Sequence, residues 1–229
     1  MKLRTLFFVL LVSMMATTVF VSCSDDDDDD DNSTETFLKS PYLICVSRNP
    51  GGVGFDFEYN GGKGGANNLD SLTATGFTHD MFIKTVKGEK ADGSLGGAPY
   101  FKLSSGTLGA VNYSAVDASC KGIDAFNSLT ASNIKAYTLK KDSINFDLTS
   151  LPTGSKGKPL MSALKKEYKK LVIGMKWRET ANNDVENDEL VWIIKTREKR
   201  LVKLIVTDFP ASPAPTATGY IAITWDFLN

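Results

Sequence analysis

Large apolar residues recur at every second position in the last β-rich run of the chain. In the segment 219–227 the odd positions share one face of an extended strand, and the even positions share the other. The odd face carries Ile221, Ile223, Trp225 and Phe227. Two further β-rich runs, 189–196 and 200–209, are separated by a tight REKR turn, and a proline-rich loop precedes the last run. Because proline cannot extend a strand inside a sheet, the pattern predicts a three-stranded antiparallel meander over 189–227.

Shorter β-rich runs in the rest of the chain predict further strands at 42–47, 53–59, 79–86, 99–105, 144–148 and 170–179. The glycines of RNPGG favour a hairpin between the first two, and the glycine-rich segment 60–68 is expected to be a loop. Leu160, Leu164 and Tyr168 share one helical face and predict a short helix over 159–170. Residues 113–133 alternate less clearly, and 120–129 suits a short helix or turn. We therefore expect a mainly β domain, an antiparallel sheet or sandwich with one or two short helices.

The first 22 residues have the pattern of a secretory signal peptide. Lys2 and Arg4 give a basic start, an apolar run follows, and Ser22 is the small residue that precedes Cys23. The apolar run is too short to span a bilayer comfortably, which takes roughly 20 apolar residues. The segment 1–22 is therefore predicted to be removed from the mature protein.

The junction VFVSC resembles the lipobox of bacterial lipoproteins, in which the cysteine receives a lipid and becomes the new N-terminus. The run SDDDDDDD that follows resembles the acidic export signal of Bacteroidota surface lipoproteins. The resemblance implies acylation at Cys23, palmitate included, a tether over 23–36, and an outer-membrane anchor facing the cell exterior. The alternatives are an ordinary signal peptide with an incidental cysteine, and an acidic spacer with no address. The single folded domain is expected to cover 37–229.

Charge and cysteine content narrow the function further. From Phe37 onward 24 basic residues face 19 acidic ones, but the lysines are dispersed, so nucleic-acid binding is not expected. Export through an oxidising compartment permits a disulfide between Cys45 and Cys120. Two buried free thiols are the alternative.

The residue inventory argues against most enzymes. His79 is the single histidine, so a two-histidine zinc site is excluded, and neither GxSxG nor CxxC occurs. The GKG of residues 62–64 lacks the Ser or Thr of a phosphate-binding loop. We expect a non-enzymatic protein without a metal centre. Paired carboxylates leave a glycoside hydrolase open, and the candidates are Asp142, Asp147, Glu179, Asp184, Glu186 and Asp188.

The segment WIIKTREKRLVKLIVTDFPASPAPTATGYIAITWDF, residues 192–227, resembles the C-terminal end of HmuY-type haem-binding lipoproteins. That resemblance implies haem capture and delivery to an outer-membrane transporter. In the family two side chains on neighbouring β-fingers hold the iron, histidines in some members and methionines in others. Met175 stands in the corresponding place here, with Met161 or His79 as its partner. Packing in the core is the alternative role for Met175.

The aromatic residues leave a second class of function open. A surface lipoprotein can bind a glycan or another protein through exposed aromatic rings, and Trp177 and Trp192 are the candidate platforms. Haem binding would give a visible absorption band, whereas glycan binding would give none.

Overall fold

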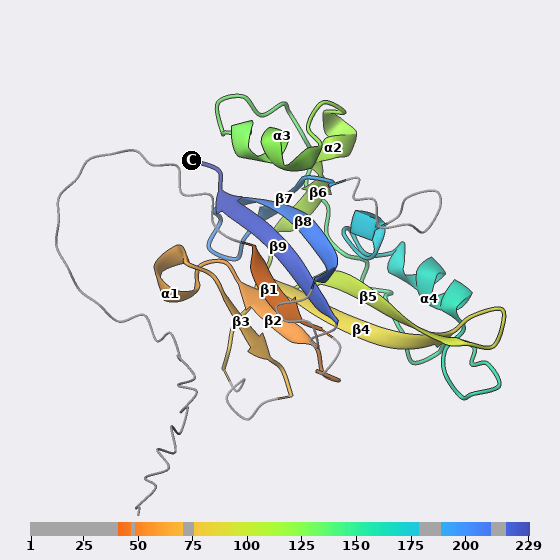
Figure 1. Cartoon of the computed structure of the whole chain (residues 1–229). Helices are drawn as coiled ribbons and strands as arrows, with labels where there is room; N and C mark the ends of the chain where they lie inside the picture. The colour runs from red at the N-terminus through yellow and green to blue at the C-terminus, as the bar shows by residue number, and fades with distance from the viewer. Residues whose placement is uncertain (1–40, 47–48, 71–75, 179–188, 212–218) are drawn as a thin grey trace, which may run out of the picture. The chain divides into compact units, whose positions relative to one another are not determined.

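The computed structural model describes residues 41–46, 49–70, 76–178, 189–211 and 219–229. Residues 38–229 belong to one compact unit. The predicted signal peptide, Cys23 and the tether up to residue 36 lie outside the described residues. Nine strands in two antiparallel sheets and four short α-helices make up the described part (Figure 1). The prediction of a mainly β, sandwich-like fold is confirmed.

The first sheet has five strands in the order β1 (Tyr42–Cys45), β9 (Tyr220–Phe227), β8 (Leu201–Ala211), β7 (Trp192–Lys195) and β6 (Gly109–Asn112). β7, β8 and β9 are consecutive antiparallel neighbours, with Leu204 opposite Trp192 on one side and opposite Trp225 on the other. The predicted three-stranded meander is therefore confirmed, and the odd face of β9 lies in the main apolar core.

The second sheet has four strands in the order β3 (Gly65–Asn68), β2 (Val53–Asp56), β4 (Met81–Glu89) and β5 (Leu95–Leu103). β4 and β5 form a nine-residue antiparallel hairpin. Its turn closes with a hydrogen bond of 2.8 Å from Lys90 N–H to the Ser94 carbonyl. The strands predicted at 79–86 and 99–105 are confirmed with shifted ends.

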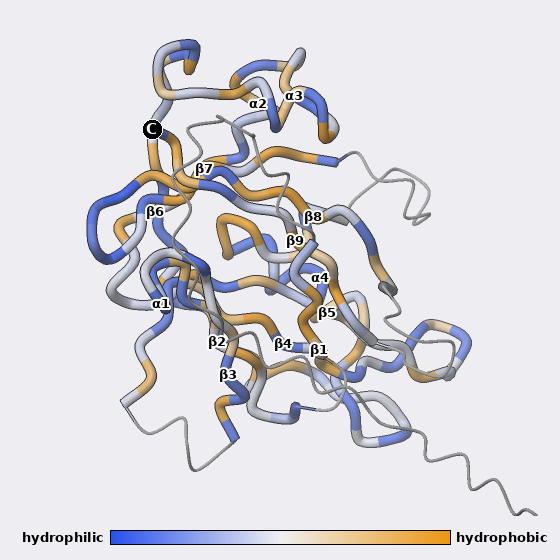
Figure 2. Tube along the Cα trace, turned by 60° about the vertical axis from the view of Figure 1, so that its left-hand side comes forward, coloured by the Kyte–Doolittle hydropathy of each residue, from blue (hydrophilic) through white to orange (hydrophobic). Residues whose placement is uncertain are grey.

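The two sheets pack face to face around one apolar core. Period-two alternation sends Phe55 and Ile83 of the second sheet and Leu204 and Trp225 of the first into this core, all of them buried. The rings of Phe55 and Trp225 meet edge to face with centroids 6.0 Å apart. The hydropathy colouring of Figure 2 shows apolar stretches along both sheets.

Helices cover the outer faces. α2 (Tyr113–Val116) and α3 (Gly122–Ser128) lie over the first sheet, where Ile193 and Ile205 point outward into a second apolar cluster. Lys203 is buried beneath α3 and its Nζ donates to the carbonyls of Phe126 and Leu129, at 2.7 and 2.8 Å. The last carbonyls of a helix lack intrahelical partners of the regular kind, and the lysine bonds to them here, so it fastens the end of α3 to β8.

α4 (Met161–Tyr168) lies over the outer face of β4 and β5 (Figure 1). Leu164 and Tyr168 are buried against that sheet, so the predicted helix and its apolar face are confirmed. Tyr168 stacks on Tyr100 of β5 with ring centroids 4.6 Å apart. A further one-turn helix, α1 (Tyr59–Gly62), follows β2.

The predicted hairpin between 42–47 and 53–59 is wrong. β1 pairs with β9 of the first sheet, whereas β2 pairs with β3 and β4 of the second, so the chain crosses between the sheets. Gly52 permits the crossing, because its φ is +92° and a Cβ there would lie 2.4 Å from the Phe82 ring. The glycines make a sheet-to-sheet corner and no hairpin.

Three other local predictions need correction. Residues 65–68 of the expected loop form β3. The predicted strand 170–179 is not formed over its described residues, 170–178. Gly174 has a φ of +56° and makes a single β-bridge, to Phe101, and a 3-10 helix follows at Lys176–Arg178. Residues 144–148 form turns and bends, and Ile144 is 98% exposed.

Candidate functional site

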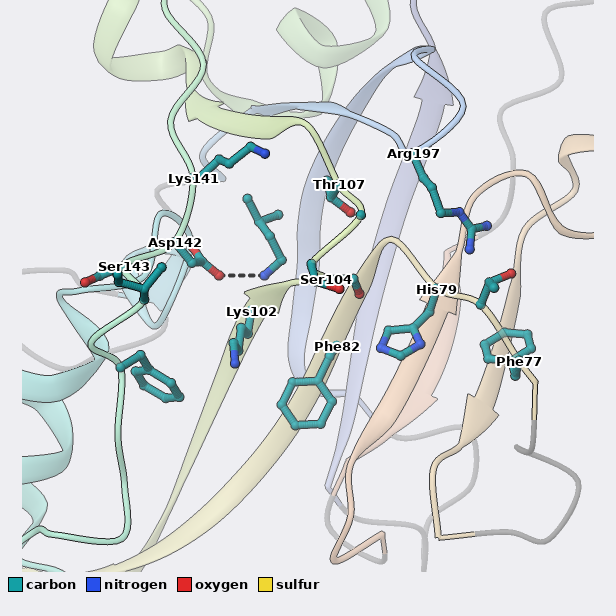
Figure 3. Close-up of a pocket in the computed structure, with 16 residues that line it drawn as sticks. Phe77, His79, Phe82, Lys102, Ser104, Thr107, Lys141, Asp142, Ser143 and Arg197 are labelled. Carbon is teal, nitrogen blue, oxygen red and sulfur yellow. Dashed lines mark hydrogen bonds between the residues drawn. The ribbon is translucent and has the colours of Figure 1, made fainter.

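A cavity of about 880 Å³ opens beside the start of β4 and the end of β5. Its lining comes from four stretches that lie far apart in the chain: 77–82, 102–107, 141–146 and Arg197 (Figure 3). Ligand pockets of small molecules typically have volumes of about 300 to 1,000 Å³ and mix apolar walls with a few polar groups. Aromatic rings supply the apolar part here, from Phe77, Phe82 and Phe146.

His79 contributes an imidazole to the cavity from just before β4. A Cβ on Gly54 would lie 2.8 Å from its Cγ, so the glycine on β2 lets the ring lie against the sheet. The Phe77 ring is nearly parallel to it, at 9° with centroids 6.3 Å apart. Nδ1 of His79 is buried and has no hydrogen-bond partner among the described residues. Burial lowers the pKa of His79, so the imidazole is neutral at pH 7.

Asp80, the residue after His79, connects several segments next to the cavity through hydrogen bonds. Its side chain is fully buried and accepts hydrogen bonds from the backbone N–H of Phe57 at 3.2 Å and of Arg197 at 3.0 Å. Its carbonyl accepts from Ser104 N–H at 2.9 Å and from Thr107 Oγ1 at 2.6 Å. Burial raises the pKa of Asp80. One residue thus holds the turn after β5 and the β7–β8 turn in place.

Ser104 also lines the cavity. Its Oγ is buried and, like Nδ1 of His79, has no partner among the described residues. Both atoms are closed off from solvent, and a Cβ on Gly54 would lie 3.1 Å from Nδ1, so this nitrogen lies against β2. Buried polar groups without partners are uncommon in native proteins.

Two lysines lie on the side of the cavity away from His79 in Figure 3. Lys102 Nζ is 5.3 Å from the centroid of the Phe146 ring, and Lys141 is exposed. Neither ammonium has an ion-pair partner in the described part of the chain. Arg197 differs, because its guanidinium pairs with Asp56 at 3.3 Å and with Glu198 at 2.8 Å.

Asp142 stands beside these lysines, but its carboxylate is already used. Oδ2 accepts from Leu103 N–H at 2.7 Å and Oδ1 accepts from Val172 N–H at 2.6 Å (Figure 3). Burial raises the pKa of Asp142. The residue therefore clamps the segment 141–146 to the end of β5 and shapes the cavity wall.

The structure separates the three predicted haem ligands. His79 lines the cavity, whereas Met175 is buried with Tyr100 and Tyr168 under α4. Met161 packs against the same cluster, and its Cε would lie 3.1 Å from a Cβ on Gly88. The two methionines are neighbours of one cluster, and neither lines the cavity.

The other candidates are placed as follows. Trp177 and Trp192 are 6% and 1% exposed, so the prediction that they offer exposed stacking platforms is wrong. Cys45 and Cys120 are free thiols. Asp147 accepts hydrogen bonds within its own turn from Thr149. The remaining carboxylate candidates, Glu179, Asp184, Glu186 and Asp188, lie outside the described residues.

Sequence reasoning missed most of the cavity. Arg197 was part of a turn pattern, and Lys102, Lys141 and Ser104 carried no motif. The one local signal was the pair Lys140 and Lys141 directly before Asp142, a charged stretch in a segment otherwise expected to enter a strand.

No protein-family model matches this chain, and no curated protein or solved structure matches it significantly. Among the described residues, no helix is long and apolar enough to cross a membrane. No group of three or more histidine, cysteine, aspartate or glutamate side chains in the described ranges is placed to hold a metal ion.

Proposed function

We propose that this chain is a surface-anchored lipoprotein whose folded domain captures a small ligand without changing it chemically, and that haem is that ligand. The support for the anchor is the sequence junction at Cys23 with its acidic run. The observation that carries the capture is the cavity, with its aromatic walls, its half-buried imidazole and its cations. A protein of this kind would pass its ligand to an outer-membrane transporter.

The residues of the cavity fit haem. The His79 side chain lines the cavity, and its ring is neutral at pH 7, which is the form that binds iron. Phe77, Phe82 and Phe146 would pack against the apolar macrocycle. Bound haem supplies an iron with open axial positions, and the protein supplies the imidazole and the apolar enclosure.

Met175 and Met161 enter this proposal as the competing assignment. A haem held by either methionine would lie over Tyr100 and Tyr168, where α4 already packs. His79 lines the cavity, whereas Met175 is buried in the packed cluster, so we assign the axial role to His79.

A visible-absorption titration with haemin tests the capture. The purified protein in detergent should bind haemin with a saturable shift of the main absorption band. His79→Gln removes the imidazole while keeping a polar side chain, and should change the band and weaken binding at least tenfold. Met175→Leu keeps the volume and removes the sulfur, so it should leave the spectrum unchanged. Absence of any band would reject haem, and a spectral change in Met175→Leu alone would move the site under α4.

Acylation has a separate test. Cys23→Ala should abolish incorporation of a fatty-acid analogue and release the protein from membranes, because one residue carries the whole lipid anchor. Labelling that persisted in this variant would reject the anchor and leave the capture proposal intact.

Glycan binding is a second candidate function, favoured by one observation. Tyr59 is 53% exposed and its ring contacts Phe77, with centroids 5.9 Å apart, so an aromatic row runs from the surface toward His79. Sugars stack on such rings. Binding of a polysaccharide that Tyr59→Ala abolishes, with no haem band in the parent protein, would favour this candidate.

A further inference from the structure

The charged and apolar parts of the cavity come from different segments. Phe77, His79 and Phe82 lie along the start of β4, while Lys102 and Lys141 lie toward the segment that Asp142 clamps (Figure 3). A ligand that fills the cavity would therefore meet an aromatic surface on one part of its outline and two ammonium groups on another.

Like most lysines of the described residues, Lys102 and Lys141 form no ion pair, and they differ from the others in lining the cavity. Lys135 pairs with Asp117 at 2.8 Å, Lys170 with Glu167 at 2.8 Å, and Arg200 with Glu58 at 2.9 Å. Lys102 and Lys141 have no such partner in the described ranges. The carboxylate beside them, Asp142, already accepts two backbone N–H groups.

The environment of Lys102 strengthens its attraction for an anion. Its side chain is half-buried and its ammonium lies over the Phe146 ring. The Asp142 carboxylate interacts electrostatically with Lys102 but forms no ion pair with it in the described contacts. A partly desolvated lysine gains more from a ligand carboxylate than a fully hydrated lysine does. Ser143 also lines the cavity, and its Oγ accepts a hydrogen bond from Asn145 N–H at 3.2 Å.

Ile144 adds an apolar edge at the same place. It lines the cavity and is 98% exposed, the most exposed large apolar side chain among the described residues. Its neighbours Ser143 and Phe146 also line the cavity, so this exposed apolar side chain borders the cationic part. The combination suits a ligand that is apolar over most of its outline and charged at one edge.

We propose that the cavity selects ligands with a carboxylate-bearing edge on a flat apolar body, and that Lys102 and Lys141 bind the carboxylates while Phe77, His79 and Phe82 bind the body. This inference rests on the proposed capture function and adds to it the chemical class of the ligand and its orientation. It assigns specificity to two lysines that take no part in holding the iron.

The test compares haemin with haemin dimethyl ester, which keeps the porphyrin and the iron and replaces both carboxylates by neutral esters. Each is titrated into the purified protein in the same non-ionic detergent. The parent protein should bind the ester about tenfold more weakly, which corresponds to about 1.4 kcal/mol. Haemin affinity should fall as salt is raised, and ester affinity should not.

Two double variants test which lysines bind the carboxylates. Lys102→Gln with Lys141→Gln should bind haemin and the ester equally, at the parent's affinity for the ester. Lys87→Gln with Lys140→Gln removes the same charge from exposed lysines outside the cavity lining, and should keep the tenfold preference. The ester affinity also reports whether each variant retains the folded cavity.

The outcomes separate this inference from the capture function. Equal binding of haemin and ester by the parent protein would overturn the carboxylate inference and leave capture standing. So would a tenfold preference that survives in the Lys102/Lys141 variant, or a loss of ester affinity in that variant. If the parent bound neither compound, capture of haem and the inference built on it would both fall.

Discussion

The backbone N–H of Leu103 donates to Oδ2 of Asp142 at 2.7 Å, across 39 positions of sequence. The bond joins the last residue of β5 to the segment 141–146, and Oδ1 of the same carboxylate accepts from Val172. One side chain therefore fixes the cavity wall that carries Lys141 and Phe146.

Removal of this clamp should affect both stability and binding. Asp142→Ala leaves two backbone N–H groups without their acceptor, so the free energy of unfolding should fall by about 2 kcal/mol. Asp142→Asn keeps one acceptor oxygen and should cost less. Urea denaturation measures both, with Asp147→Ala as the control because that carboxylate serves only its own turn in the described contacts. Equal stability of Asp142→Ala and the control would show that the clamp is not formed in solution.

Glu89 makes a comparable anchor at the far end of β4, and its effect should depend on pH. Its carboxylate accepts from Lys156 N–H at 2.8 Å, and from Ser155 N–H and Oγ at 3.1 and 2.8 Å. These hydrogen bonds, that of Lys156 first, lower the pKa of Glu89. A carboxyl with a lowered folded-state pKa stabilises the fold above its unfolded pKa of about 4.3, and this contribution is lost as pH falls through the folded value.

Glu89→Gln should therefore lower the thermal midpoint at pH 7, and the deficit should shrink as the pH is lowered below about 4. Thermal unfolding followed by circular dichroism at several pH values measures it. Asp208→Asn, a change at an exposed carboxylate, should show no such deficit at pH 7. A deficit that stayed constant down to pH 2 would assign the effect of Glu89 to packing and not to its charge.

Trp177 is a core residue and not part of an exposed binding surface. It is 6% exposed, its indole contacts Phe101 edge to face, and Nε1 donates to the Gly174 carbonyl at 3.1 Å. Trp177→Ala should cost about 3 to 5 kcal/mol. Tyr59→Ala, at an exposed ring, should cost about 0.5 kcal/mol or less. Chemical denaturation compares the two, and a neutral Trp177→Ala would contradict the packing described here.

The sequence predicted the strands and the helix whose contacts are with segments close by in the chain. The meander of β7, β8 and β9 and the face of α4 followed from local periodicity, because each residue's neighbour lies one turn or one hairpin away. The pairing of Tyr42 with Ile223 did not, since they are 181 positions apart and only the completed sheet brings them together. The glycine turn between β1 and β2 looked the same whether it led to a hairpin or to a second sheet.

The cavity was beyond sequence reasoning for the same reason. His79 was identified because it is the only histidine in the chain, and its position in the cavity depends on Gly54 of a neighbouring strand. Lys102 and Lys141 are ordinary lysines until the fold places them beside a carboxylate that is already occupied. The type of each residue can be read from the sequence, whereas the contacts of its side chain depend on the fold.

The central claim is that the ligand lies in the cavity lined by His79. Paramagnetic broadening of backbone amide signals tests it most directly, because the iron of haemin broadens the signals of nearby residues and spares distant ones. A ¹⁵N-labelled sample titrated with haemin should lose the amide signals of His79, Phe82 and Lys102 first, while those of α3 on the outer face of the first sheet stay sharp. Broadening centred on α3, or an unchanged spectrum at saturating haemin, would contradict the claim.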